Sequence, residues 1–541
     1  MRLTRATPGN RGALVLMDSS DELACHVAGV AVLSLLRHMG LPHYAADLAG
    51  EAPPQKPEIG LVLLAQDGLG SHLPQQWVEF IGNAAHAGAG LVSFDGRPDL
   101  WPPELQRLFG LRAAGTPAEV ASLRDLAPDS WVTALREAGT TWPLRSPVPV
   151  APVQSAPGAV PLLDSAVGPA AWLHEGATYR AAAWATSAVL WCPDYLGHAA
   201  GLDDLCWRAI VWAMPKPVLL HCFPPFLTVR VGGATGAADG FAWVGALAQH
   251  GLVPEIGLLT DEVPPPAWQQ ARRLQEAGRA RFSAEAFTAE RLIYAGDHTP
   301  QYPANHVPAL PDDELERRLT RAHAQLARAG LRPSAVAVPR FCEYGSNVPD
   351  RLLERGQESI CTPFLPNETL GLEHEEWAPQ PYGHGRFLAD FLPDFPDLLA
   401  FAAGASEPTR DLDAGALART VALGLDSLFW GCLALEEREL LPLGVEGVGE
   451  LLKAVLAALG GREWLPATLE DVAHCARGKA TVDLTSAAAS RGTGELRWAL
   501  SAPAPCPLML SLFTEARGEV VREHVGVPAG ERRGVHRLAP L

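Results

Sequence analysis

Short runs of apolar residues alternate with segments of helical periodicity over the first part of the chain. Residues 13–17, 61–64 and 91–94 are apolar runs of strand length, which is typical of buried strands. The polar residues 18–21 follow the first run and offer helix N-caps, and apolar residues then recur at helical spacing over 27–36. Strands and helices that alternate with short loops predict a doubly wound, parallel α/β sheet.

A second series of strand and helix patterns follows in the middle of the chain. Strands are expected at 226–231, 253–259 and 335–338. The segment 312–329 has the pattern of an amphipathic helix with one apolar face, made of Leu315, Leu319, Ala322 and Leu326. Repeated β/α units over about 200 residues predict a closed or open β/α barrel.

Changes of pattern divide the chain into four predicted segments. Residues 11–220 form the α/β domain, in which the Pro-, Ala- and Ser-rich stretch 140–170 is expected to be a long irregular loop. Residues 221–410 form the barrel, and 411–478 form a helical extension. Residues 479–541 show short strand patterns separated by Gly, Pro and Ser, which predicts a small β-sandwich cap. The predicted fold class is therefore α/β and multidomain.

The composition restricts the classes of partner. The 541 residues include 43 Lys and Arg against 61 Asp and Glu, which gives a formal charge of −18. Such a chain lacks the basic face that non-specific binding to nucleic acid or to an anionic membrane requires, so we expect neither partner. The longest apolar stretch is well short of the roughly 18 residues of a membrane helix. Nine cysteines without a CxxC pair predict free, buried thiols in a reducing compartment, and hence a cytoplasmic protein.

A set of motifs follows the first domain. The segment 224–236 has the sequence Pro-Pro-Phe-Leu-Thr-Val-Arg-Val-Gly-Gly-Ala-Thr-Gly, and it is followed by Phe241-Ala-Trp243, by residues 251–254 and by Thr260-Asp-Glu262. Together these segments resemble the start of the barrel in polysaccharide deacetylase-like proteins of the glycoside hydrolase/deacetylase superfamily. The layout resembles larger members, in which a class I amidotransferase-like domain precedes the barrel, and helices and a β-rich tail follow it. The resemblance covers most of the chain.

The resemblance implies metal-dependent amide hydrolysis on a saccharide. In such a site one Asp and two His hold a divalent metal that polarises the carbonyl and activates water, and a second Asp acts as the base. The resemblance places these paired aspartates at Gly232 and Gly233, which have no side chains to bind a metal or accept a proton. We therefore expect weak or absent deacetylase activity, and no cofactor at full occupancy.

A second element of the resemblance is a His-Ser/Thr pair followed by another His. The sequence Asp297-His298-Thr299 fits the pair, and His306 follows His298 by eight residues, a wider step than is usual for two ligands of one metal. Asp297, His298 and His306 are the candidate ligands of a residual divalent metal such as zinc. The alternative is a solvated loop with incidental histidines.

The third element is the segment Pro339–Asn347 after a predicted strand. It resembles the Arg-x-Pro-x-Gly strand end of deacetylases, where an arginine orients the catalytic carboxylate. Arg340 and Glu343 are therefore the candidate catalytic residues, because sites form at the carboxyl ends of barrel strands. In another alignment with the longer members Arg340 replaces a ligand His, and a strand-end ion pair is the structural alternative.

The first domain lacks the nucleophile of amidotransferase chemistry. Its third strand is followed by Phe94-Asp-Gly-Arg97, which contains no Cys, and Cys25 and His26 are adjacent residues that point about 100° apart on a helix. We therefore expect no glutaminase activity. The charged run Glu436–Glu439 is expected to be a solvated surface.

Two classes of function remain. The first is a carbohydrate-active, deacetylase-like protein with impaired or lost hydrolysis, because its paired aspartates are replaced. The alternative is a non-catalytic saccharide-binding protein, or an assembly scaffold, whose oligomeric state the sequence leaves open. Exposed Trp or Tyr at the mouth of the barrel would favour saccharide binding, whereas a mouth filled by the chain's own segments would favour a structural role.

Overall fold

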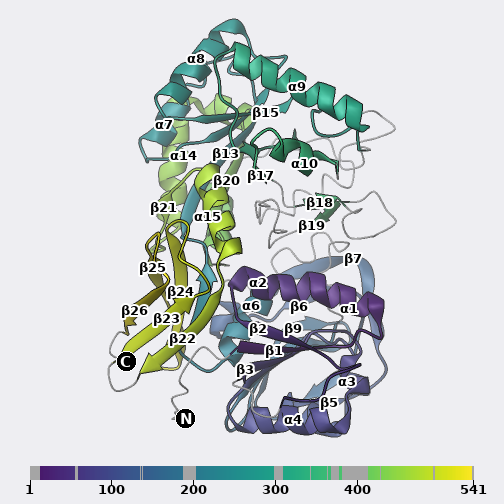
Figure 1. Cartoon of the computed structure of the whole chain (residues 1–541). Helices are drawn as coiled ribbons and strands as arrows, with labels where there is room; N and C mark the ends of the chain where they lie inside the picture. The colour runs from purple at the N-terminus through teal and green to yellow at the C-terminus, as the bar shows by residue number, and fades with distance from the viewer. Residues whose placement is uncertain are drawn as a thin grey trace. The chain divides into compact units, whose positions relative to one another are not determined.

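The computed structural model describes residues 12–54, 59–134, 136, 138–186, 203–297, 309–340, 343–345, 347–361, 364–366, 377–379, 412–426, 428–490 and 494–538. The chain divides into two compact units, Met1–Cys222 with Thr481–Leu541, and Phe223–Ala480. The boundaries predicted near residues 220 and 480 lie close to the two junctions, and the division groups the C-terminal strands with the first unit. Each unit is described by itself (Figure 1).

The first unit is built on a nine-stranded sheet. The strands, in spatial order, are β2 (His43–Asp47), β1 (Gly12–Met17), β3 (Ile59–Leu64), β4 (Gly90–Ser93), β11 (Arg180–Trp184), β10 (Gly168–Glu175), β9 (Ala159–Ser165), β6 (Ala118–Asp125) and β7 (Thr141–Val150). The first five pair in parallel and the others antiparallel. Every residue of β3 is buried, as a strand covered on both faces requires. The predicted strands at 13–17, 61–64 and 91–94 are confirmed.

Helices cover the parallel half of this sheet. They are α1 (Glu22–Ala28), a π-helical turn (Gly29–Leu33), α2 (Ser34–Met39), α3 (Leu69–His72), α4 (Gln75–His86), α5 (Pro103–Leu108) and α6 (Asp203–Ala213). Figure 1 shows α1 and α2 on one side of the sheet and α4 on the other. Asp21 caps α1 by accepting the N–H of Ala24 at 3.1 Å, as the polar residues after the first strand predict.

The irregular loop predicted over residues 140–170 is wrong. This stretch contains β7, β8 (Val153–Ser155), β9 and the start of β10, and β8 pairs with β5 (Leu111–Ala113). The prolines that suggested a loop, Pro143, Pro147 and Pro149, lie on β7 at the edge of the sheet. An edge strand tolerates proline because one side of its backbone needs no partner strand.

The C-terminal strands form two small antiparallel sheets in the first unit. One contains β12 (Val218–Cys222), β24 (Leu508–Ala516) and β25 (Glu519–Val527), and the other contains β22 (Leu484–Ser490), β23 (Glu495–Leu500) and β26 (Arg533–Arg537). The pairing of β12 with β24 explains why residues from both ends of the chain share this unit. The strands bear out the change to a β pattern, and the β-sandwich itself stays a prediction.

The second unit contains a parallel sheet with the order β15 (Arg281–Ala286), β14 (Glu255–Leu259), β13 (Phe226–Ala234) and β20 (Gly431–Glu436). The short β21 (Leu465–Pro466) pairs with the start of β13, and β16 (Val336–Ala337) pairs in parallel with β17 (Ser359–Ile360). Two further short strands, β18 (Phe364–Pro366) and β19 (Trp377–Pro379), pair with each other. The protein is thus a mixed α/β protein with several sheets, and a barrel stays a prediction.

The helices of the second unit are α7 (Val244–Ala248), α8 (Pro265–Glu276), α9 (Asp312–Arg328), α10 (Val348–Leu353), α12 (Ala414–Asp426), α13 (Glu437–Leu440), α14 (Gly444–Ala458) and α15 (Leu469–Thr481). The predicted apolar face of α9, Leu315, Leu319, Ala322 and Leu326, is fully buried in the main core of this unit. Helix α14 packs against α7 and α12, and all three contribute to the same core.

The two faces of the parallel sheet differ sharply. Alternate residues of its four strands belong to the main core, and these are Leu227, Val229, Val231, Ile256, Leu258, Phe282, Ala284, Leu433 and Leu435. Because successive side chains of a strand point to opposite faces, the intervening residues share the other face. They are small or polar: Thr228, Arg230, Gly232, Glu255, Gly257, Ser283, Glu285, Cys432, Ala434 and Glu436. This polar face carries the candidate site at its carboxyl end.

Helix α15 also covers apolar side chains at and beside the short strands. Its Leu469 and Ala473 form a separate small cluster with Val336, Val338 and Cys361, outside the main core. Glu470, in its first turn, accepts the N–H of Ala335 at 3.1 Å. The chain's own helix therefore occupies part of the space beside β16 and β17.

Candidate functional site at the strand ends

Gly232 and Gly233 form a bulge at the carboxyl end of β13. Val231 pairs with Ile256 and Ala234 pairs with Leu258, so that two glycines stand opposite one residue of β14. Gly233 has a φ of +59°, in the left-handed region that favours glycine. The pair that lacks the expected aspartates thus has a backbone role in the bulge.

The space beside these glycines is filled by a buried ion-pair network. Arg340 Nη1 donates to Glu285 Oε1 at 3.0 Å and to Glu436 Oε2 at 2.7 Å. The side chains of Arg340 and Glu285 are 5% and 4% exposed, and that of Glu436 is 30% exposed. Glu285 Oε2 also accepts the N–H of Gly233 at 2.7 Å. We call Glu285, Arg340 and Glu436 the strand-tip network.

Glycines on neighbouring strands make room for this network. A Cβ atom at Gly257 would lie 2.3 Å from Glu285 Oε2, and one at Gly232 would lie 2.7 Å from Glu436 Oε1. A Cβ atom at Gly233 would lie 2.6 Å from Glu436 Oε2 and 2.9 Å from Arg340 Nη1. Real Cβ contacts are longer, so side chains at these positions would displace the charged groups.

Burial sets the electrostatics of the network. Desolvation raises the pKa of Glu285 to about 7, Arg340 opposes the shift, and Glu436 adds to it. Arg340 is the cation of the network, because an arginine keeps its proton at any ordinary pH. A buried glutamate with a raised pKa, a charge partner and a place at a strand end is typical of a functional site, and also of a structural ion-pair network.

Glu437, next to the network, holds the loop that follows β13. Its carboxylate accepts the N–H of Thr235 at 2.7 Å, the Thr235 hydroxyl at 3.1 Å and the N–H of Gly236 at 3.1 Å. Burial raises the pKa of Glu437 in spite of these bonds. Glu436 and Glu439 form a capping box around α13. The solvated surface expected for this run is therefore wrong at Glu437, whose exposure is 3%.

The structure separates the sequence-predicted site residues. Arg340 lies at the centre of the strand-tip network, and Glu343 is buried close to it, with its N–H donated to the carbonyl of Arg340 at 3.0 Å. Asp297 accepts from Arg318 Nη1 at 2.6 Å and from the N–H of Leu292 at 3.1 Å. The predicted ligands His298 and His306 lie outside the described residues. Their ligand role, that of Asp297 and the catalytic roles of Arg340 and Glu343 stay predictions.

The described residues at the strand ends do not fit a deacetylase metal. Gly232 and Gly233 supply no donor, and a guanidinium lies between the two carboxylates that come closest to them. Within the described part of the chain, no group of three or more His, Cys, Asp or Glu side chains is arranged to hold a metal ion. A cation between Glu285 and Glu436 would have to displace Arg340.

Sequence reasoning missed Glu285, Glu436 and Glu437. The strand Arg281–Ala286 was not expected, because its segment contains Arg, Ser and Glu on the polar face. The available signal was Glu285 in an alternating pattern, in which Phe282, Ala284 and Ala286 are apolar. For Glu436, the signal was a glutamate at the end of the short apolar run Cys432–Leu435.

The first unit has a buried carboxylate directly after β4, where an amidotransferase-like domain would carry its nucleophilic Cys. Asp95 accepts the N–H groups of Gly68 at 2.8 Å, Gly70 at 2.7 Å and Arg97 at 2.9 Å, and Trp101 Nε1 at 2.7 Å. Complete burial raises its pKa to about 6, and these bonds oppose the shift. All four bonds tie the surrounding loops together, so Asp95 has the geometry of a structural anchor.

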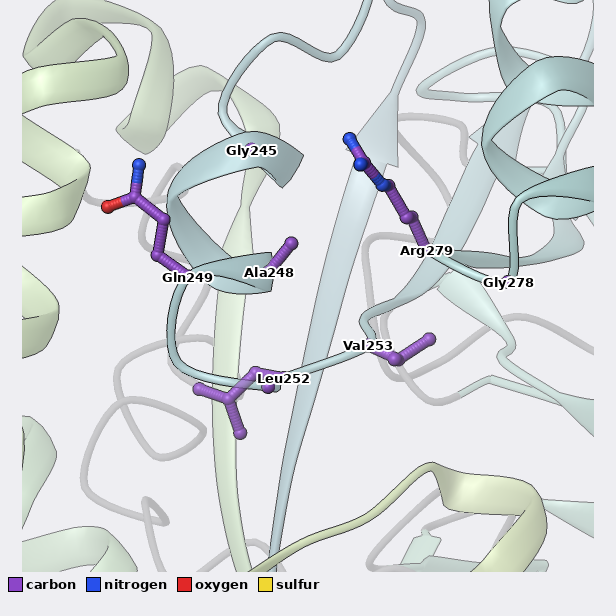
Figure 2. Close-up of a pocket in the computed structure, with 8 residues that line it drawn as sticks. Gly245, Ala248, Gln249, Leu252, Val253, Gly278 and Arg279 are labelled. Carbon is purple, nitrogen blue, oxygen red and sulfur yellow. The ribbon is translucent and has the colours of Figure 1, made fainter.

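A shallow cleft lies at the other end of the parallel sheet. It has a volume of about 420 Å³ and is lined by Gly245, Ala248, Gln249, Gly251, Leu252, Val253, Gly278 and Arg279. Figure 2 shows α7 on one side and, on the other, the loops that carry Val253 and Arg279. These loops lead into the amino ends of β14 and β15, so the cleft is not at the strand tips. Arg279 is its one charged lining residue.

Two further observations concern the described residues as a whole. The seven cysteines in the described part of the chain are free, and all but Cys25 are buried, in agreement with the free thiols expected from the sequence. No helix in that part is both long and apolar enough to cross a bilayer.

The comparisons with known proteins give likenesses at low identity. No protein-family profile matches the sequence, and no curated protein matches it at a significant level. Similar solved structures include a family 4 carbohydrate esterase from Streptomyces lividans, which is 11% identical, with 45% of this chain and 100% of that chain covered and a TM-score of 0.26. The BpsB deacetylase domain from Bordetella bronchiseptica is 16% identical, with 29% and 70% covered and a TM-score of 0.19.

PurLQS from Thermotoga maritima is also similar, with 13% identity, 37% of this chain and 98% of that chain covered and a TM-score of 0.25. Solved structures similar to this chain thus include a carbohydrate esterase, a deacetylase domain and PurLQS. Each of these TM-scores is below 0.3, so the likenesses carry no information about the function of this chain.

Proposed function

We propose that this chain is a deacetylase-like protein that has lost metal-dependent amide hydrolysis, and that its second unit serves as a scaffold for assembly. The observation that carries the proposal is the strand-tip network. Arg340 lies between Glu285 and Glu436, beside two glycines at the positions where the sequence resemblance expects aspartates.

The chemistry explains why this arrangement opposes hydrolysis. Metal-dependent cleavage of an amide needs a cation to polarise the carbonyl and a free base to accept a proton from water. The side chains of Glu285 and Arg340 are almost completely buried, and the partly exposed Glu436 is paired with Arg340 and caps α13. Removing the base alone costs roughly 10²–10⁴ in rate, and losing a metal ligand adds to that loss.

The surroundings favour a scaffold over saccharide binding. The described aromatic residues near the strand ends include Phe241, Trp243, Phe287, Tyr294 and Tyr344. Each is at most 2% exposed, so none of them offers a face on which a sugar could stack. Helix α15 packs its own apolar side chains beside β16 and β17. A chain that fills its strand-end region with its own groups has the properties expected of a structural domain.

Two measurements on the purified full chain test the proposal. Metal analysis by mass spectrometry should find no stoichiometric zinc, and incubation with N-acetylglucosamine oligomers should release no acetate above the level of a protein-free control. An active carbohydrate esterase assayed in parallel shows that the substrate is competent. Stoichiometric zinc together with turnover would overturn the proposal.

A third measurement separates the scaffold from the saccharide-binding alternative. Light scattering after size-exclusion chromatography should give a mass well above the 57.6 kDa of one chain. Calorimetric titration with acetylated and de-acetylated glucosamine oligomers should give no saturable heat. Saturable binding to a monomeric chain would instead support the saccharide-binding function.

A further inference from the structure

We propose that Arg340 is a built-in cation that replaces the metal ion of a deacetylase-like site and makes the second unit independent of any metal. This inference rests on the proposed function and names what holds the strand ends together in the absence of a metal. It concerns one guanidinium and two carboxylates from different strands, with bond lengths of 3.0 Å to Glu285 and 2.7 Å to Glu436.

The first argument is electrostatic. Glu285 and Glu436 meet at one nitrogen atom, and two carboxylates in such a site repel each other strongly unless a cation lies between them or one of them holds a proton. A divalent ion can do this but dissociates when its concentration falls, whereas an arginine is covalently attached and permanently charged. The guanidinium therefore gives the network a cation at every metal concentration.

The second argument is steric, and it links the lost aspartates to the arginine. A Cβ atom at Gly233 would lie 2.9 Å from Arg340 Nη1 and 2.6 Å from Glu436 Oε2. Any side chain at 233 would therefore crowd both members of the ion pair. The glycine that removes a ligand thus also provides the room in which the guanidinium and the Glu436 carboxylate meet.

The third argument is the environment of the carboxylates. Glu285 Oε2 is held by the N–H of Gly233, and the Glu436 carboxylate caps α13, so that both groups are fixed by the backbone as well as by Arg340. If Arg340 were removed, Glu285 and Glu436 would be relieved either by a proton on one of them or by a bound cation, for which their side chains offer oxygen donors only. Such a set prefers hard cations such as Ca²⁺ and Mg²⁺, and with so few ligands it should bind them weakly.

The test is the thermal response of an Arg340→Met variant to divalent cations at about pH 9, because removal of Arg340 raises the pKa of Glu285 further above about 7 and a proton would compete with the cation at neutral pH. The thermal unfolding midpoint of the wild-type chain should stay the same in the presence of a chelator. It should also stay the same in 10 mM CaCl₂, compared with NaCl at equal ionic strength. The Arg340→Met midpoint should be lower and should rise by about 3 °C in 10 mM CaCl₂, if the dissociation constant is about 1 mM. Calorimetry with CaCl₂ alone should give saturable heat for this variant only.

Two further variants keep the test decisive. Glu285→Gln/Arg340→Met should recover stability without calcium and lose the calcium response, because one carboxylate is gone. Arg136→Met is the matched control: it removes a buried arginine that pairs with the Asp125 carboxylate 2.7 Å away, so it should be destabilised without recovery in calcium. If Arg340→Met does not fold, folding of the double variant supports the proposal, and failure of both overturns it.

The possible outcomes separate this inference from the proposed function. The built-in cation proposal is overturned if Arg340→Met folds but responds to calcium no more than Arg136→Met does. That outcome would leave the proposed loss of hydrolysis untouched. A wild-type chain that is destabilised by chelator overturns the built-in cation as well. Acetate release by the wild type overturns the proposed function by a separate assay.

Discussion

The packing of Glu285 over Gly257 makes the strand-tip network open to a quantitative test. A Cβ atom at Gly257 would lie 2.3 Å from Glu285 Oε2 and 3.1 Å from the Glu285 Cβ atom. The substitution Gly257→Ala therefore forces the carboxylate away from the N–H of Gly233, now 2.7 Å from it, and from Arg340, now 3.0 Å away.

The expected cost follows from these lost contacts. Breaking a buried ion pair costs about 3–5 kcal/mol, so we expect Gly257→Ala to lower the free energy of unfolding of the second unit by about 3 kcal/mol. In a Glu285→Ala background the obstructing carboxylate is absent, and the same substitution should cost less than about 1 kcal/mol. The two sites should therefore show a coupling free energy of about 2 kcal/mol or more.

Hydrogen exchange of peptides from β13 and β15 measures this coupling, with urea unfolding as the global readout. Local exchange is needed because a chain of two units need not unfold in one step. The control is Gly449→Ala in α14 of the same unit, where a Cβ atom would meet nothing within 4 Å, so the free energy of unfolding should rise by about 0.5–1 kcal/mol. A coupling below about 0.5 kcal/mol would refute the packing of Glu285 over Gly257.

Three further predictions concern buried carboxylates. Because burial raises the pKa of Glu285 from 4.5 to about 7, the native state holds a proton that the unfolded chain releases, and the wild-type chain should lose stability as the pH rises through this range. Glu285→Gln should remove that part of the slope in urea titrations at several pH values; an unchanged slope would contradict it. Glu437→Ala should speed hydrogen exchange at Thr235 and Gly236 by about 100-fold, because about 2–3 kcal/mol of charge-assisted hydrogen bonding is lost. Glu437→Gln should keep most of the protection of these two amides. Equal protection in both variants would show that the carboxylate does not hold the loop. Asp95→Asn should destabilise the first unit by about 2–4 kcal/mol, because the NH₂ group of the new amide would face N–H donors. Hydrogen exchange at Gly68 and Gly70 should become faster. Unchanged exchange at these two amides would show that Asp95 is not a structural anchor of the loops.

The sequence by itself determined the elements that depend on local periodicity. The strands at 13–17, 61–64 and 91–94 and the apolar face of α9 are set by the order of apolar residues along the chain, because burial selects for a period of two or 3.6 residues. That Gly232 and Gly233 have no side chains was equally visible. The mistaken loop at 140–170 shows the limit, since prolines exclude central strands but not edge strands.

Only the tertiary structure decided which charged groups lie beside Gly232 and Gly233. Arg340 is 55 residues from Glu285 and 96 from Glu436, and no local pattern links residues that meet only when three segments pack together. Their meeting also depends on Gly232, Gly233 and Gly257, whose absent side chains leave the space that the charges fill. Periodicity tells which face a residue occupies, whereas partners across a sheet are set by register and by sterics, which exist only in the folded chain.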